Sequence, residues 1–240
     1  MNGKVATVLS ELRAHAPFTL FGSLTGLVMM LFFRHLPETT TYTLFYVFHP
    51  LHVTLSAIVA GSIFRLHERT RSFLVVLLVG YCASVGTATV SNSIIPFFGE
   101  SILGVAIPTE DKVHEGAQAS AESSPGASSE QHAPKIHLGF IEEWYIVNPA
   151  ALLGLLIGNF LPRTKFPHAG HILISTWASA AHIMMNTHTD ITALTILGML
   201  CVLFVAVWVP CCSSDIIVPL LFTRSPHVHL GHDHAKEVRT

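Results

Sequence analysis

Long apolar runs with almost no charge are the feature that most constrains how this chain can fold. A helix needs about 20 consecutive apolar residues to cross a bilayer. Only 12% of the 240 residues are charged, whereas an ordinary soluble domain has about 25%. Backbone groups in lipid must satisfy their own hydrogen bonds, so such runs predict helices. We expect an all-α, polytopic membrane protein with six spans, at residues 17–33, 41–64, 72–98, 141–161, 167–185 and 191–222.

The third and the sixth runs are too long for plain straight spans, and each contains a polar interruption. The third contains Ser91, Asn92 and Ser93, and the sixth contains the polar residues at 210–215. Membrane proteins tolerate irregular backbone where it is buried in protein or lines a cavity. We therefore expect both helices to be broken at these positions.

Motifs of the first three runs recur, in the same order, in the last three. The matched positions are Pro17, Gly22 and Gly26 with Pro149, Gly154 and Gly158, and Ser91, Asn92 and Pro96 with Ser214, Asp215 and Pro219. Because each unit has three spans, the second would enter the membrane from the opposite side. This predicts two inverted repeats, a construction of many transporters whose site lies near mid-membrane.

The predicted organisation has four parts. Residues 1–98 form the first three-helix repeat, 99–140 a polar, histidine-containing outer loop, 141–223 the second repeat, and 224–240 a histidine-rich tail. Ten of the 13 Lys and Arg residues fall on the side of the N-terminus and three on the other. Positive charge accumulates on the cytoplasmic side. We expect a multi-pass protein of the cell's inner (plasma) membrane, with both termini in the cytoplasm.

Several function classes are disfavoured by composition and motifs. The net charge of −2 argues against nucleic acid as a partner. The four cysteines lie in apolar or span-edge sequence, which argues against a disulfide framework. No phosphate loop, nucleophile elbow or His-Glu-x-x-His motif is present. The partners that we expect are the lipid bilayer and a metal ion, and a homo-oligomer is left open.

Two histidine pairs stand out within this apolar sequence. His49 and His52 are repeated, at a constant offset of 119 residues, by His168 and His171. Residues three apart lie on one face of a helix, and polar groups in a membrane tend to mark function. Imidazole is a common ligand of transition metals. The four histidines are therefore the predicted metal ligands, together with Asp215.

The prolines beside these pairs suggest how the histidines stay neutral. Pro50 and Pro167 predict that a helix begins at each of them. The positive end of the helix dipole would then disfavour imidazolium. The alternative is that backbone carbonyls, or Ser56 and Ser175, satisfy the histidines without any metal.

The two pairs lie at unequal depths in the predicted spans. His49 lies well inside the second span, whereas His168 lies near the cytoplasmic mouth of the fifth. They meet only if the chain at residues 166–167 dips into the protein, or if the fourth span is short and tilted.

Asp215 and Asn92 occupy matching positions in the sixth and third runs. A carboxylate in an apolar run is costly unless it meets a cation or a proton. Asp215 is therefore a candidate metal ligand or proton carrier, and Asn92 is its uncharged counterpart in the pathway. Both residues could instead cap the helical segments that follow them.

Other residues extend the candidate pathway. His182 lies about three turns beyond His171 on the same helix face. Cys211 and Cys212 are vicinal thiols that could bind a soft metal, or could serve only as small packing residues. Glu142 and Glu143 border the fourth span, where a solvated interface is favoured. The histidines of the tail predict loose metal capture, with a solvated low-complexity tail as the alternative: His227, His229, His232 and His234.

The function that these features favour is transport of a divalent transition metal (Zn, Ni, Co, Fe or Mn) rather than catalysis. A histidine-rich tail at the cytoplasmic mouth favours export. The first alternative is a membrane-embedded metalloenzyme with the same ligands. The second is a haem-binding electron carrier with histidines as axial ligands.

Overall fold

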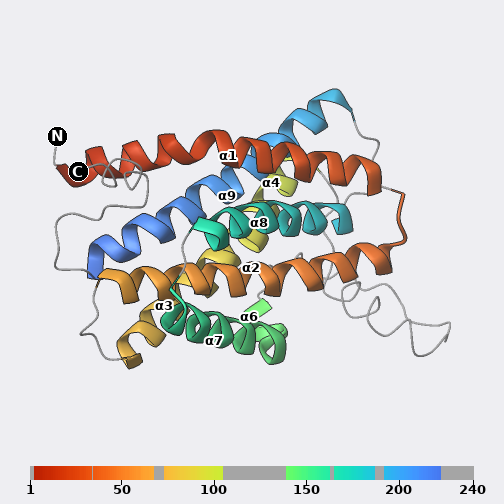
Figure 1. The fold of residues 1–240 in the computed structure, drawn as a ribbon. Helices are drawn as coiled ribbons and strands as arrows, with labels where there is room; N and C mark the ends of the chain where they lie inside the picture. Colours follow the sequence, from red (N-terminus) through yellow and green to blue (C-terminus); the bar gives the residue numbers. More distant parts are fainter. Residues whose placement is uncertain are drawn as a thin grey trace.

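The computed structural model describes residues 3–33, 35–67, 73–104, 139–162, 165–186 and 192–222. This part of the chain is helical and contains no strand (Figure 1). Its elements are α1 (Gly3–Phe33), α2 (Glu38–His67), α3 (Phe73–Thr89), the π-helix η1 (Val90–Ile94), α4 (Ile95–Leu103), α6 (Gly139–Glu142), α7 (Trp144–Phe160), α8 (Lys165–Asn186) and α9 (Ala193–Phe222). The prediction of an all-α protein is confirmed.

Four helical stretches of the described chain are long and apolar enough to cross a membrane. They are His15–Phe33, Thr39–Arg65, Phe73–Leu103 and Ala193–Cys211. Large apolar side chains such as Phe32, Leu74 and Leu194 are exposed on their outer surfaces, as contact with lipid requires. α7 is apolar but has only 17 residues, and α8 carries three histidines among its 22.

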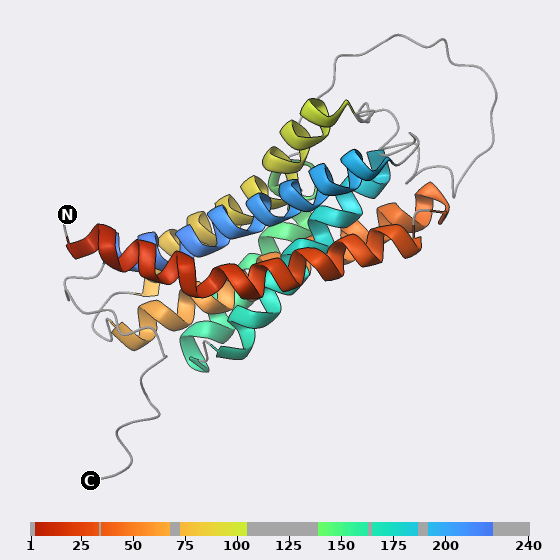
Figure 2. The same cartoon turned by 90° about the horizontal axis from the view of Figure 1, so that it is seen from above.

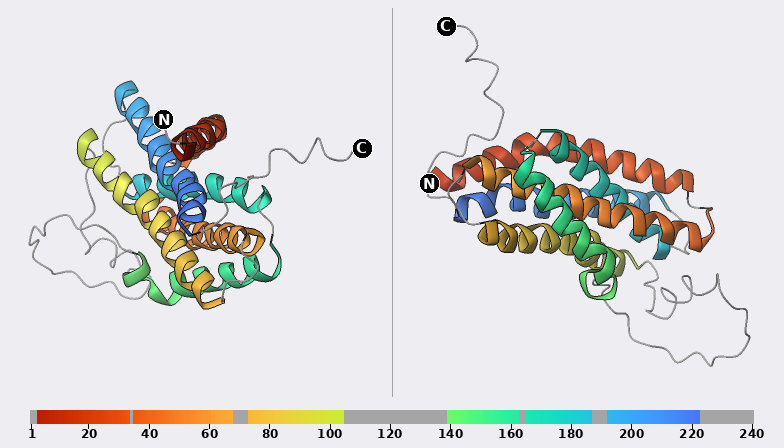
Figure 3. Two further views of the ribbon diagram at one scale, coloured as in Figure 1. Left: turned by 90° about the vertical axis from the view of Figure 1, so that its left-hand side faces the viewer. Right: turned by 60° about the horizontal axis from the view of Figure 1, so that its bottom comes forward.

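The helices pack as one elongated bundle with α2 and α8 at its centre (Figures 2 and 3). α2 packs against α3, α7 and α8, and α8 packs against α1, α2 and α9. α1 also packs along α9, and α3 packs along α7. α2 and α8 therefore pack against each other, and the other long helices pack around them.

Glycines allow the closest of these approaches. A Cβ at Gly154 would lie 2.4 Å from the carbonyl oxygen of Thr54, and one at Gly158 would lie 2.4 Å from that of Ile58. Small residues let membrane helices approach backbone to backbone. The glycine pair of α7 thus seats this helix directly on α2.

The predicted break in the third run is a π-helical turn rather than an unwound segment. η1 contains Ser91, Asn92 and Ser93, and it joins α3 to α4 without loss of helical structure. Such single π-turns occur frequently at functional sites. α4 then continues to Leu103, beyond the predicted end of the run at residue 98.

Two other predictions about helix ends are wrong. α9 runs through residues 210–215 as one α-helix, and α2 runs through Pro50. Prolines are tolerated inside membrane helices, because neighbouring groups satisfy the backbone carbonyls that they free. His49 and His52 consequently lie in the middle of α2, where the dipole argument for neutral imidazole does not apply. α8 does begin near its proline, at Lys165.

The unequal depths of the two histidine pairs are resolved by the short α7. Figure 1 shows that α7 ends, and α8 begins, short of the end of the bundle where α1 begins and α2 ends. The first turns of α8 therefore lie beside the middle of α2, and the ring of His171 stacks on that of His52.

Candidate metal centre

Three buried side chains from three helices converge in the middle of the bundle. His52 of α2, His171 of α8 and Cys211 of α9 place one ligand atom each within 4.8 Å of one another. Nε2 of His52 lies 3.9 Å from Sγ of Cys211. In tetrahedral zinc, bond lengths near 2.0 Å to nitrogen and 2.3 Å to sulfur put such atoms about 3.5 Å apart. A small inward movement would therefore let this group hold a metal ion.

The hydrogen bond of His171 prepares its ring for this role. Its Nδ1 lies 3.1 Å from the carbonyl oxygen of His168. A carbonyl oxygen only accepts, so Nδ1 carries the proton and Nε2 presents a lone pair. Metal-binding histidines commonly donate their other ring N–H to a carbonyl in this way.

Asn92 connects the two histidines of α2 to the centre of the bundle. Its Nδ2 lies 3.0 Å from Nδ1 of His49 and 2.9 Å from Nδ1 of His52. Its Oδ1 accepts hydrogen bonds from the hydroxyls of Ser91 at 2.9 Å and of Ser175 and Ser179 at 3.3 Å each. The π-turn presents this amide to α2 and α8 together.

This network has two chemically complete arrangements. As drawn, the amide nitrogen donates to both Nδ1 atoms, so each neutral ring carries its proton on Nε2. After exchange of Oδ1 and Nδ2 of Asn92, the two N–H groups can donate to two of the three serine hydroxyls, because a hydroxyl can accept as well as donate. Both Nδ1 atoms then donate to Oδ1. Only this second arrangement gives Nε2 of His52 the lone pair that a metal needs.

The other two predicted histidine ligands, His49 and His168, extend away from the group in opposite directions. Nε2 of His49 lies against Gly139, where an added Cβ would be only 2.8 Å away, and its ring stacks on Phe45. The ring of His168 contacts His171 on one side and His15 of α1 on the other, with centroids 5.4 Å and 4.7 Å apart. The sequence pattern therefore places two of its four histidines at the centre.

Together these contacts form a polar string along the bundle. Its members, in spatial order, are His15, His168, His171, His52, Asn92 and His49, followed by Phe45, His182 and Glu100. His15 begins the first apolar span, and Glu100 lies near the end of the third. The string therefore runs from the level at which α8 begins, inside the bundle, to the end of the bundle where α4 ends, with Phe45 as its one apolar member.

Sequence reasoning missed Glu100 and misjudged Glu143. Glu100 was assigned to the outer loop, but α4 carries it into the bundle, where Nδ1 of His182 lies 3.0 Å from its Oε1. Glu143 was expected to be solvated, yet it is only 2% exposed and is hydrogen-bonded to Tyr46. The apolar sequence on both sides of Glu100 could have predicted its burial, because it allows the helix to continue past this residue.

Several predicted residues cannot be placed at this centre. Asp215 and Cys212 lie on α9, but their side chains are outside the part of the chain that is described. The same is true of the whole tail segment with its predicted capture residues, His227, His229, His232 and His234. Comparisons of the chain with protein-family models, curated proteins and solved structures find no match.

Proposed function

We propose that this protein is a membrane transporter of a divalent transition metal, with His52, His171 and Cys211 as its central ligands. The proposal rests on the polar string inside the bundle, which contains the candidate metal group and leads from it to the end of the bundle where α4 ends. Ionisable side chains inside membrane proteins commonly mark ion and proton pathways. A transporter needs such a path from both sides.

The donor set favours particular metals. Two imidazoles and a thiolate suit zinc, cobalt and nickel, whereas manganese prefers oxygen ligands. The group supplies three ligands, which leaves the fourth tetrahedral position open, as in sites that exchange a ligand. Such an incomplete coordination shell suits an ion that must both enter and leave the site. Asp215 remains a further candidate ligand on sequence grounds alone.

The packing supports the inverted-repeat construction. Exchanging α1 with α7, α2 with α8 and α3 with α9 maps the main helix contacts onto one another. In the glycine motifs, Gly22 and Gly26 of α1 face Thr176 of α8, as Gly154 and Gly158 of α7 face α2. In this scheme α7 and α8 complete six spans. The metal group lies between the repeats, where inverted-repeat transporters hold their cargo.

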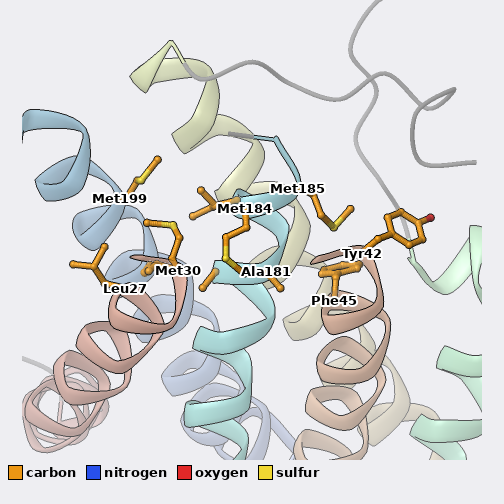
Figure 4. Close-up of a cluster of buried hydrophobic side chains, with 11 residues drawn as sticks. Leu27, Met30, Tyr42, Phe45, Ala181, Met184, Met185 and Met199 are labelled. Atoms are coloured by element: carbon orange, nitrogen blue, oxygen red, sulfur yellow. The ribbon is translucent and has the colours of Figure 1, made fainter. Parts of the chain in front are cut away.

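An apolar cluster around Phe45 interrupts the string between His49 and His182. Leu27 and Met30 of α1, Tyr42 of α2, Ala181 and Met184 of α8 and Met199 of α9 pack together there (Figure 4). His15 and His168, at the end of the string away from this cluster, are only half-buried. If the N-terminus lies in the cytoplasm, as the distribution of Lys and Arg residues predicts, this conformation is closed toward the outside. Rocking of one repeat against the other would open it.

A membrane metalloenzyme is the second candidate, because an open fourth position also suits a metal-bound water. A haem carrier is less well supported. The rings of His52 and His171 are stacked, with centroids 5.6 Å apart and an angle of 8° between planes. Axial ligands must instead point at the iron from opposite faces of a porphyrin.

Zinc uptake into proteoliposomes that contain a zinc-sensitive dye tests the proposal. We expect the wild-type protein to carry zinc and the double variant His52→Ala, His171→Ala to lose this activity, because two of three ligands are gone. His35→Ala is the control, since His35 is exposed at the end of α1. Equal uptake by the double variant and the wild type would contradict the proposal.

A further inference from the structure

Glu100 and His182 form a second buried polar site, separate from the candidate metal group. Oε1 of Glu100 lies 3.0 Å from Nδ1 of His182, and the glutamate is 1% exposed. A buried carboxylate is costly unless it is protonated or meets a cation. A proton shared with His182 satisfies this requirement, whether it resides on the oxygen or on the nitrogen.

An apolar barrier separates this pair from the metal group. The ring of Phe45 lies between His49 and His182, with centroid distances of 5.2 Å and 5.5 Å, and Phe45 is 1% exposed. α4 also packs against α9. Gly99 of α4 contacts Val202 of α9, and Leu103 of α4 contacts Gly198 of α9, so these contacts contain no ionisable group. Phe45 therefore separates Glu100 and His182 from the metal group.

The titratable groups on the neighbouring elements form a distinct network. Tyr42 and Tyr46 of α2 hydrogen-bond each other through their hydroxyls, and Tyr46 is also hydrogen-bonded to Glu143. His49 is held by Asn92. Glu100 and His182 thus place a carboxyl group and an imidazole in direct contact at this end of the bundle, where one proton can be shared between them.

Charge balance links the two sites. A divalent ion that binds to two neutral imidazoles and to Cys211 displaces the proton of the Cys211 thiol, which lies 3.8 Å from the hydroxyl of Ser175. The resulting thiolate balances one of the two charges of the ion and leaves one positive charge uncompensated in the bundle. Release of the proton shared by Glu100 and His182 leaves one negative charge along the same string. Opposite charges attract strongly where water is scarce, so a bound metal would favour proton release, and a bound proton would favour metal release.

We propose that Glu100 and His182 are a proton-binding site of a metal/proton exchanger, and that this pair gives up one proton for each divalent ion bound, besides the proton that the Cys211 thiol loses. The inference rests on the proposed transport function and supplies its coupling ion. When the barrier at Phe45 opens, the aqueous space at that end of the bundle would reach the central group as well as the pair, so that the metal and the proton exchange with the same side.

Two assays on reconstituted protein separate coupling from transport. Zinc counterflow, with no pH gradient, reports movement of the metal alone. Zinc accumulation against its own gradient, driven by a pH gradient, reports coupling. We expect Glu100→Gln and His182→Gln each to lower the ratio of zinc accumulation to zinc counterflow relative to the wild type, because one of the coupled protons is missing. Glu142→Gln is the control, because Glu142 is only partly buried at the same end.

Proton release on zinc binding in detergent gives an independent readout. Glu100→Gln should release one proton fewer per zinc ion than the wild type, because the shared proton is absent. A ratio of accumulation to counterflow that equals the wild-type ratio in either variant would overturn the proposal. Loss of zinc binding in both variants would also overturn it, because the pair would then belong to the metal site itself. A wild-type protein that carries no zinc would instead refute the transport function.

Discussion

Asn92 is the residue on which the candidate metal centre depends most, although it is not itself a proposed ligand. Its amide decides which nitrogen of His49 and His52 carries the proton. Removal of a partner that orients a metal-binding histidine typically lowers metal affinity about 10- to 100-fold. The π-turn at residues 90–94 places this amide level with His49 and His52 of α2.

Two substitutions of Asn92 should therefore act in opposite directions. Asn92→Leu should weaken zinc binding by about 10- to 100-fold, because His52 loses the partner that fixes its tautomer. Asn92→Asp should tighten it, because a carboxylate only accepts and so keeps both protons on Nδ1. Titration of the purified protein against a chelator of known affinity measures both effects.

Ser93→Ala provides the matched control for these variants. Ser93 is a neighbour of Asn92 in the π-turn, and its buried hydroxyl has no hydrogen-bond partner among the described residues. Its removal should leave zinc affinity unchanged. An Asn92→Leu protein that binds zinc as tightly as the Ser93→Ala protein would show that the amide has no part in the site.

At the level of single residues, the sequence predicted part of this centre. The repeated spacing predicted His52 and His171 among its four histidines, and Cys211 was a candidate as one of two vicinal thiols. The same spacing could not say that His49 and His168 would turn away, because that depends on Gly139 and His15, which are distant in sequence. Burial of Glu100 depended on where α4 ends, and helix ends are poorly defined by composition.

The contact of α7 with α2 is the element-level feature that places α8. Since α7 is short and its glycines sit on the backbone of α2, α8 begins deep inside the bundle. His171 can then reach His52. The apolar pattern predicted the helices themselves, and the glycine spacing suggested a repeat, but neither could give the depth at which α8 begins.

Gly154→Ala should loosen this contact. The added methyl group would lie 2.4 Å from the carbonyl oxygen of Thr54, a backbone atom that cannot rotate away. Forcing extra volume into a packed interface typically costs about 1–3 kcal/mol. We expect a lower melting temperature in detergent and weaker zinc binding.

Gly86→Ala is the comparison for this change. Gly86 lies in α3, and an added Cβ would meet nothing within 4 Å. Alanine favours helix over glycine by about 1 kcal/mol, so this variant should be as stable as the wild type or more so. Equal melting temperatures for the Gly154→Ala protein and the wild type would argue against the close α7–α2 contact.

At the scale of the whole molecule, the bundle combines a polar interior with an apolar exterior. The string from His15 to Glu100 follows the long axis, the cluster of Figure 4 interrupts it, and apolar side chains cover the outside. The apolar runs were sufficient to predict the exterior. This cluster could not be predicted, because its residues come from four helices that sequence alone does not bring together.

Absorption spectra of the cobalt-loaded protein can show whether His52, His171 and Cys211 bind one metal ion together. A cobalt–thiolate bond gives a charge-transfer band in the near ultraviolet, and tetrahedral cobalt gives intense visible bands. We predict both for the wild-type protein and for Cys82→Ser and Cys201→Ser, whose cysteines are exposed. Cys211→Ser should lose the ultraviolet band, and His52→Ala should lose the tetrahedral visible spectrum. A wild-type spectrum that Cys211→Ser leaves unchanged would contradict the account.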